Sequence, residues 1–462
     1  MQLSAICEDR NKNIIPGLLS AHHAVLHGDG NIVDMSTAEN WAIKETLIPK
    51  VRKALARISE QNSKDLAYAS GVGGCTKTRT GIARLLNDHF CPSQTVDPSH
   101  IVLAAGGSFA LSALIDQICD PGDAILIAAP YWPGLDIAIS IHSRAEVVPV
   151  HVPLDEFFQP ESVQYYEEAL RLASSRARGV LICNPHNPLG QCYPRTTLHE
   201  MRHFCAKNNL HLISDEVYAL SAHQPIPDDT VPFTSILSVD SEEAGKGNPD
   251  VHVIYSLSKD FGCNGIRVVR YRTLAITSAP GILTNPAKFF CRARWRLLTK
   301  HSSVSSKGAL VNQTNTALRM GAALSVHSQV STLSTFLASN VLLAPEAVEE
   351  VTSHGGSQCR QSYETVRSFL QGWTMDFIPV QYGVYVFARL AELNNQDEEA
   401  ELQKCLKQRG VSVSTGTSYH LANPGWFRIC YGMPLAELQR GLDRLDKGLK
   451  DYLQKKNYPP HN

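Results

Sequence analysis

The stretch YSLSKDFGCNGIRV places Lys259 between an apolar run and a glycine-containing turn. Ser256 and Ser258 come just before this lysine, and Arg267 follows it eight residues later. A lysine held in a semi-buried site at a strand end has a lowered pKa, so its amine can attack a carbonyl carbon. Nearby hydroxyls and a guanidinium can hold a phosphate. Taken alone, such a lysine is more often an ordinary surface residue, so the hypothesis needs support from the rest of the chain.

Polar residues follow three other apolar runs. Asp215 follows LHLIS, with Tyr218 three residues later, and Asn187 lies in the turn NPHNPLG. A buried carboxylate at a strand end is more often structural than catalytic unless a cation meets it. The stretch GGSFALSALI places Gly107 and Ser108 at the start of an expected helix, where backbone N–H groups suit an anion. Each of these patterns is weak when it stands alone.

Together these groups suit one cofactor, pyridoxal 5'-phosphate. It requires a lysine for its aldehyde, a carboxylate that keeps its pyridine nitrogen protonated, donors for its ring oxygen and donors for its phosphate. Each of these groups is present, and each follows its own apolar run. We therefore predict a pyridoxal-phosphate enzyme, and the predicted site contains no metal.

Five apolar runs that precede these residues are predicted strands: HIVLAAGG, DAILIAAP, GVLICNP, HLISDEVY and VHVIYSLSK. They alternate with helical patterns such as FALSALIDQIC, which predicts an α/β fold with a mainly parallel sheet covered by helices. Functional groups in such sheets gather beyond the carboxyl ends of the strands. From about Asn340 the pattern changes to a smaller α+β domain. The predicted parts are an N-terminal segment that packs with the small domain (1–60), the large domain (61–335) and the small domain (336–462).

The chain resembles the fold-type-I (class I and II) pyridoxal-phosphate-dependent aminotransferases, and within them the 1-aminocyclopropane-1-carboxylate synthase-like branch. SLSKDFGCNGIRV is similar to the lysine motif of that branch, NPHNPLG to its asparagine turn and SDEVYA to its aspartate–tyrosine pair. VDMSTAENWAI, PYWPGLD and NPGWFRICYG are similar to its N-terminal segment, aromatic stretch and carboxylate-binding strand. The similarity extends from about Ile32 to Asp443.

The resemblance implies a catalytic role for three residues. Lys259 would bind the cofactor aldehyde and, once released by the substrate, would move the proton at the substrate Cα. Asp215 would pair with the pyridinium nitrogen, and Tyr218 would hydrogen-bond the ring oxygen. Asn187 would also bond the ring oxygen and would lie beside the substrate.

The resemblance also implies how the rest of the site is built. The phosphate would be bound by backbone donors, hydroxyls and a guanidinium, from Gly107, Ser108, Ser256, Ser258 and Arg267. Either Tyr131 or Trp132 would stack on the cofactor ring, and the spacing leaves this choice open. Arg428 would bind the substrate α-carboxylate, and Glu39 would line the substrate pocket.

A homodimer with shared active sites is a further implication of the resemblance. Tyr68, in AYASG, would reach across the dimer interface to the phosphate of the neighbouring subunit. The small-molecule partner would be an amino acid or a compound derived from one.

Residues 269–307 interrupt the family pattern. Without them Val268 would join Gly308 and restore GIRVGALVNQ. The segment contains eight Lys and Arg residues and no Asp or Glu. Three interpretations remain open: a basic lid or membrane-surface helix, a functionally silent loop, or translated non-coding sequence such as a retained intron. The clean junction and the acid-free composition favour the third.

Several reactions suit the same motifs. We favour an aminotransferase-type enzyme that acts on an α-amino acid, in a fungal type of secondary metabolism. The alternatives are a carbon–sulfur lyase that works by β-elimination, a 1-aminocyclopropane-1-carboxylate synthase and an inactive homologue of the fold. Phe109, where the plant synthases have a hydroxyl residue, argues against the synthase reaction.

Composition limits the remaining classes of function. The formal net charge of -1 over 462 residues argues against a nucleic-acid or acidic-lipid partner. No window contains the roughly 18 unbroken apolar residues of a spanning helix. The twelve cysteines show no metal-like pairing, so we expect reduced thiols and a cytoplasmic protein without a membrane partner.

Overall fold

The computed structural model describes residues 4–13, 32–58, 73–228, 230–239, 250–266, 269–274 and 330–457. Two predicted cofactor-binding residues, Tyr68 and Arg267, lie outside the described residues.

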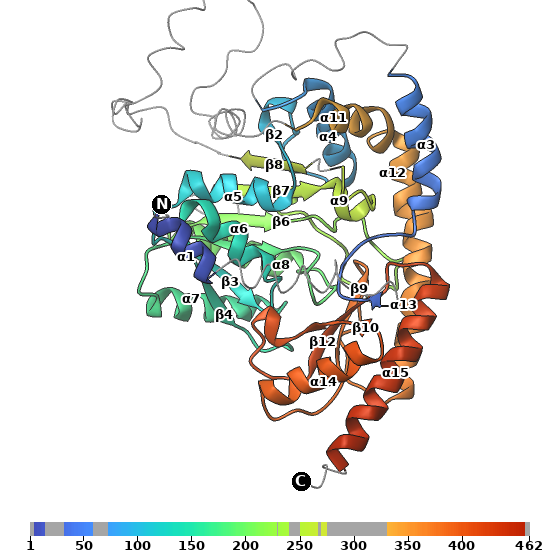
Figure 1. The fold of residues 1–462 in the computed structure, drawn as a ribbon. Helices are drawn as coiled ribbons and strands as arrows, with labels where there is room; N and C mark the ends of the chain where they lie inside the picture. Colours follow the sequence, from blue (N-terminus) through green and yellow to red (C-terminus); the bar gives the residue numbers. More distant parts are fainter. Residues whose placement is uncertain are drawn as a thin grey trace, which may run out of the picture.

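A seven-stranded sheet with the order β2-β8-β7-β6-β5-β3-β4 forms the centre of the large domain (Figure 1). The pairs β4–β3, β3–β5, β5–β6 and β6–β7 are parallel, whereas β8 is antiparallel to both of its neighbours. This arrangement confirms the predicted α/β fold, although β4 and β8 were not among the predicted strands. The strands are β2 (Ile101–Ala104), β3 (Ala124–Ala129), β4 (Glu146–His151), β5 (Ala177–Cys183), β6 (His211–Asp215), β7 (Val251–Ser256) and β8 (Val269–Leu274).

Helices cover both faces of this sheet. They are α4 (Thr76–His89), α5 (Gly107–Ile118), α6 (Gly134–Ser143), α7 (Val163–Leu172) and α8 (Arg195–Lys207). Successive strand residues point to opposite faces, so Ile125 and Ile127 pack in one core with α5 and α6. Leu126 packs in another core with α4, α7 and α8. Because β3 is covered on both faces, all six of its residues are buried, which explains its unbroken apolar sequence.

The ends of the central strands set the position of the chemical groups. Asp215, the last residue of β6, is in register with Cys183 of β5 and Ile254 of β7. Two residues after Ile254, β7 ends at Ser256 and the chain turns into the short helix α9 (Leu257–Asp260). The carboxylate of Asp215 and the lysine of α9 therefore lie at the same edge of the sheet.

The small domain contains the three-stranded antiparallel sheet β11-β12-β9. These strands are Ser414–Thr415 (β11), Trp426–Cys430 (β12) and Tyr385–Arg389 (β9). The helices α13 (Gly356–Gly372), α14 (Gln396–Gln408) and α15 (Leu435–Asn457) pack with them, and Figure 1 shows α13 and α15 side by side. An antiparallel sheet covered by helices is the α+β pattern that the sequence predicts for this region.

Residues 33–35 of the N-terminal segment pack with the small domain, whereas Ile43, Leu47 and Ala54 pack in the core of the large domain. The strand β1 (Val33–Asp34) pairs in parallel with β10 (Val411–Ser412), and Val33 and Met35 are fully buried in the small-domain core. The chain then crosses back to the large domain.

The remaining helices and helical turns are α1 (Ala5–Asn13), α3 (Lys44–Ala56), η2 (Pro98–His100), η3 (Pro160–Ser162), η4 (Ile236–Ser238), α11 (Thr332–Leu337), η8 (Ala338–Leu342), α12 (Pro345–Glu350), η9 (Val351–Gly355) and η10 (Thr417–Tyr419).

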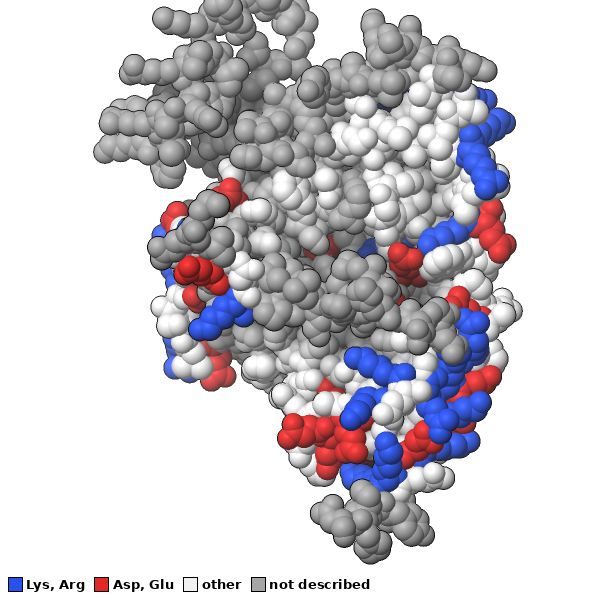
Figure 2. All heavy atoms as spheres, viewed as in Figure 1, with Lys and Arg blue, Asp and Glu red and all other residues white. Residues whose placement is uncertain are grey.

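The surface of the small domain carries charges of both signs, which Figure 2 shows interspersed on this face. Several form pairs on α15, such as Lys450 with Asp446 at 2.8 Å. Exposed pairs of this kind contribute little to stability. Among the described helices, none has the length and apolar character needed to cross a membrane.

We propose that residues 269–307 are dispensable for folding. β8, which begins this segment, lies between β2 and β7 and pairs with both. In a variant lacking 269–307, residues 308–313 would follow Val268 directly and supply six residues to the same strand position. We expect this variant to unfold cooperatively on heating, as followed by circular dichroism.

A variant lacking 269–313 is the matched control, because it also removes the replacement for β8 and should not fold. If both deletions leave the chain equally unfolded, the proposal is wrong. Sequencing spliced RNA across the junction gives independent evidence, and a transcript without the segment is the expected result.

Candidate active site

A cavity of about 370 Å³ lies at the edge of the large sheet where β6 and β7 end, and both domains contribute to its wall. Most of the predicted site residues meet here. Those that line the cavity are Gly107, Ser108, Trp132, Asn187, Asp215, Tyr218, Ser256, Ser258, Lys259 and Arg428.

Lys259 is presented to the cavity by α9. Ser256 precedes this helix with extended backbone, and its side chain accepts a hydrogen bond from the N–H of Ser258 at 3.0 Å. Nζ of Lys259 donates to the carbonyl of Ala38 at 2.9 Å. Burial, and the neighbouring charge of Arg428, lower the pKa of Lys259 from 10.5 to about 8. About a tenth of the amine is therefore neutral, and nucleophilic, at pH 7, far more than for a lysine in water.

Asp215 lies in the same cavity as a carboxylate that is poorly solvated. Its Oδ1 atom is buried and has no hydrogen-bond partner among the described residues. Burial raises the pKa of Asp215 to about 7. Such a group is stabilised by a cation with an N–H donor placed against it.

The donors suited to an anion gather at another part of the cavity. Gly106, whose φ of 110° favours glycine, is the residue before α5. As in any α-helix, the first N–H groups of α5 have no carbonyl partner within the helix and can bind an anion. Gly107, Ser108, Ser256 and Ser258 all line the cavity nearby. Helix N-termini together with hydroxyls are typical phosphate-binding groups.

Arg428 extends from β12 of the small domain into the cavity and is only 4% exposed. Its Nη1 donates to Oδ1 of Asn187 at 3.0 Å, and its Nη2 donates to the carbonyl of Ser36. Both partners are neutral, and Nε is buried without a partner among the described residues. The rings of Tyr385 and Tyr419 flank the guanidinium, with centroids 5.4 and 5.2 Å from Cζ.

The two neighbouring aromatic residues differ in their surroundings. Trp132 lines the cavity, whereas Tyr131 stacks on His420 of the small domain.

Glu39 lies behind the cavity wall rather than in it. Its Oε1 accepts a hydrogen bond at 3.1 Å from Nδ2 of Asn264, which lines the cavity. Its Oε2 pairs with Lys44 at 3.1 Å.

Sequence reasoning did not select several other residues of the wall. Asn264 was inside the quoted lysine motif and could have been selected, whereas Leu111, Leu135 and Val217 resemble any other core residue. The residues in question are Ser36, Thr37, Ala38, Leu111, Leu135, Cys183, Val217, Ile254 and Asn264.

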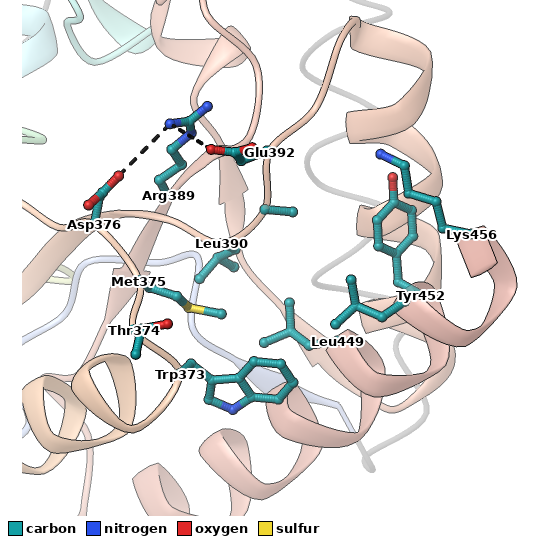
Figure 3. Close-up of a pocket in the computed structure, with 12 residues that line it drawn as sticks. Trp373, Thr374, Met375, Asp376, Arg389, Leu390, Glu392, Leu449, Tyr452 and Lys456 are labelled. Carbon is teal, nitrogen blue, oxygen red and sulfur yellow. Dashed lines mark ion pairs between the residues drawn. The ribbon is translucent and has the colours of Figure 1, made fainter.

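A second cavity, of about 310 Å³, lies in the small domain between the end of α13, β9 and α15 (Figure 3). Arg389 lies at its rim, with ion pairs of 3.9 Å to Asp376 and 3.6 Å to Glu392. The predicted site residues lie elsewhere, so this cavity does not share the chemistry of the first one.

The family follows from a comparison with known proteins. A family model described as aminotransferase class I and II matches residues 31–445. The chain belongs to the class I and II aminotransferases. This result confirms the resemblance found in the sequence, and it makes the chain an enzyme of a pyridoxal-phosphate-dependent transferase family.

Individual relatives of this class I and II aminotransferase agree with the assignment. It is 44% identical to the probable aminotransferase tcpI of Claviceps purpurea over 97% of this chain and 96% of the relative. It is 26% identical to 1-aminocyclopropane-1-carboxylate synthase 7 of Arabidopsis thaliana over 88% of this chain and 84% of that protein. An aspartate aminotransferase from Thermotoga maritima superposes with a TM-score of 0.71 at 19% identity, covering 98% and 100% of the two chains, which shows the shared fold.

The residues of this aminotransferase fit pyridoxal phosphate. The unpartnered Oδ1 of Asp215 suits the protonated ring nitrogen, and the amine of Lys259 suits the aldehyde. The N-terminus of α5, with Ser256 and Ser258, suits the phosphate. When bound, the cofactor supplies a conjugated ring that withdraws electrons from the substrate Cα.

We predict that Asp215→Asn stabilises the apoprotein. Because the pKa of Asp215 is raised from 3.8 to about 7 in the folded state, the penalty of the buried charge is absent below pH 4 and complete above pH 7. At pH 8 the free energy of unfolding should increase by about 1–3 kcal/mol. At pH 4 the variant and the parent should be equally stable by urea denaturation.

Asp123→Asn is the matched control for this experiment. Asp123 is also largely buried, but hydrogen bonds from the Asp120 backbone and from Arg176 outweigh burial and lower the pKa of Asp123. This control should lose stability at pH 8. A loss of stability in Asp215→Asn as well would show that its carboxylate has a stabilising partner, contrary to our prediction.

Proposed function

We propose that this chain catalyses transamination of an α-amino acid with pyridoxal phosphate. One observation carries the proposal: the amine of Lys259, the carboxylate of Asp215 and the guanidinium of Arg428 line a single cavity. An α-amino acid carries a carboxylate and an amine on the same carbon. In the proposed reaction, Arg428 would bind the substrate carboxylate, Lys259 would act at the carbon that carries the amine, and Asp215 would bind the cofactor ring.

Arg428 supports an α-carboxylate as the anchor of the substrate. A buried guanidinium whose partners are neutral oxygens lacks a compensating anion, and this is costly in a site of low polarity. A carboxylate would accept two parallel hydrogen bonds from its planar fork and would compensate the charge. The carbonyl of Ser36 would then be the contact that the substrate replaces.

Lys259 supports proton transfer at the substrate Cα. With a pKa of about 8, its amine can take up a proton in one step and return it in the next near neutral pH. Arg428 contributes to this property because its positive charge helps to lower the pKa of Lys259. In this proposal the same arginine binds the substrate and lowers the pKa of the lysine that acts as the base.

The names of the relatives are the basis on which we propose the reaction that follows proton removal. The relative tcpI, at 44% identity, carries the name probable aminotransferase, whereas the similarity to the Arabidopsis synthase is 26%. We therefore favour transamination over ring closure. β-Elimination of a sulfur substituent shares the same first steps and is a separate outcome of the test below.

We also propose a homodimer in which the subunits complete each other's sites. Ile48 and Leu55 of α3 and Leu333 of α11 are 48%, 39% and 43% exposed, although all are apolar. The helices α3 and α11 contact each other, so these side chains belong to adjacent elements. Apolar groups gathered in this way are typical of interaction surfaces. We expect light scattering to give the mass of two chains, and the mass of one chain would contradict this.

The proposed reaction is tested by product analysis. The purified protein, supplied with pyridoxal phosphate and 2-oxoglutarate, is incubated with a panel of α-amino acids. We expect the matching oxo acid and glutamate to form in equal amounts. Pyruvate with ammonia and a thiol would instead indicate β-elimination, aminocyclopropane carboxylate would indicate ring closure, and no product would indicate an inactive homologue.

Two variants control this assay. Lys259→Ala should reduce kcat by about 10²- to 10⁴-fold, because the group that moves the Cα proton is lost. Arg428→Lys keeps the charge but not the planar fork, so KM for the amino acid should rise by about 10- to 100-fold. An Arg428→Lys variant with the parent's KM would show that the α-carboxylate binds elsewhere.

A further inference from the structure

A contact between the two domains lies directly behind the wall of the active site. Tyr131 is buried next to Trp132, and its backbone N–H donates to the carbonyl of Tyr419 in the small domain at 3.0 Å. Its ring stacks on the imidazole of His420, with centroids 4.3 Å apart and planes inclined by 20°. The chain that presents Trp132 to the cavity is thus held from behind by the small domain.

Asp136 joins both sides of this contact. It lies in the first turn of α6, and its Oδ1 accepts a hydrogen bond from the hydroxyl of Tyr131 at 2.7 Å. Its Oδ2 lies 2.8 Å from Nε2 of His420. An ionised carboxylate can only accept, so Nε2 carries the proton and donates. One carboxylate therefore receives one hydrogen bond from each domain. We name Tyr131, Asp136 and His420 the interdomain joint.

The small-domain side of the joint leads directly to the substrate-binding arginine. His420 follows Tyr419, the last residue of η10, and the ring of Tyr419 lies 5.2 Å from Cζ of Arg428. Just before η10, Ser414 of β11 is in register with Arg428 of β12. A shift of the 414–420 segment would therefore shift the guanidinium relative to the large domain.

The large-domain side leads to the indole that lines the cavity. Trp132 is the residue next to Tyr131, and its ring packs over Gly134, where any Cβ would lie within 2.2 Å of the indole. Gly134 is the first residue of α6, the helix that carries Asp136. The position of the indole is therefore tied to the same helix as the carboxylate.

The backbone of His420 is unusual for its residue type. Its φ of 65° is in the left-handed region, which is unfavourable for a residue other than glycine. Such a conformation persists where the surrounding contacts require it. Here the contacts include two backbone hydrogen bonds that close the end of η10, from His420 to Thr417 at 3.1 Å and from Leu421 to Gly416 at 3.2 Å. The stacked ring of Tyr131 and the carboxylate of Asp136 lie against the side chain of His420.

We propose that Asp136 and His420 are positioning residues, which fix the distance between the wall that carries Trp132 and the guanidinium of Arg428. Neither residue lines the cavity. This inference rests on the proposed function, because it assigns Arg428 to the α-carboxylate of the substrate. A displaced guanidinium binds the α-carboxylate less well in the ground state and the transition state alike, so KM rises while kcat changes little.

The experiment compares His420→Ala with His420→Gln. Alanine and glutamine at position 420 must both adopt the same left-handed backbone, but only glutamine keeps a side-chain N–H that can donate to Asp136. We expect KM for the amino acid to rise about 5- to 20-fold in His420→Ala with kcat within about threefold, and to recover partly in His420→Gln. Asp136→Asn should resemble His420→Ala in its higher KM.

Hydrogen exchange of the apoprotein gives a reading that does not depend on activity. His420→Ala should raise the exchange rate in the peptide 131–143 of the other domain by about tenfold, because the bonds between the domains weaken. Asp451→Asn is the matched control, since Asp451 is 31% exposed, compared with 35% for Asp136, and pairs with Arg409 within the small domain. This control should leave both KM and the exchange of 131–143 unchanged.

The outcomes separate this inference from the proposed function. If exchange in 131–143 is unchanged in His420→Ala, or if KM stays at the parent value, the joint does not position the site. Equal effects of alanine and glutamine would also overturn the inference, because the donor would then be irrelevant. If the parent protein transaminates no amino acid, the proposed function fails, and the exchange experiment still decides whether the joint couples the domains.

Discussion

The active site depends on two buried charged groups, Asp215 and Arg428, each of which has a polar atom without a hydrogen-bond partner among the described residues. Among the described residues, Oδ1 of Asp215 has no hydrogen-bond partner, and the guanidinium of Arg428 donates to the neutral oxygens of Asn187 and Ser36. Leaving charged groups poorly solvated destabilises a protein unless a ligand compensates them. A cationic ring nitrogen would suit Asp215, and a carboxylate would suit Arg428. We therefore expect the protein to gain stability when such ligands bind, because Asp215 at the end of β6 and Arg428 on β12 of the small domain line the same cavity.

The chemical groups could be predicted from the sequence because each one follows a buried strand. LHLIS, GVLIC and VHVIYS are mostly apolar, which is typical of strands covered on both faces, and the polar residue that follows each run emerges at the sheet edge. Asp215, Asn187 and Lys259 therefore meet in the cavity as the pattern predicts. The family motif added Arg428, which no spacing argument would have joined to a residue in the large domain.

Other features of the site depend on contacts that sequence patterns do not contain. The different surroundings of Tyr131 and Trp132 could not be predicted, because Tyr131 stacks on His420, which lies nearly 290 residues later in the chain. Ser36 and Ala38 contact Arg428 and Lys259 through backbone carbonyls, so their side-chain types give no signal. The strand β8 was missed because VRYRTL interrupts the family motif and has no apolar run.

The pairing of Val33 with Val411 has a consequence for the order in which the chain folds on the ribosome. The large sheet can assemble once β8 has been synthesised, but the segment that carries Ser36 and Ala38 gains its partner strand only after almost all of the chain has been made. Contacts of such long sequence separation form slowly, because much chain entropy is lost before they are made. During translation, the unpaired beginning of the chain therefore exposes Val33 and Met35, and molecular chaperones that bind short apolar segments can recognise this stretch.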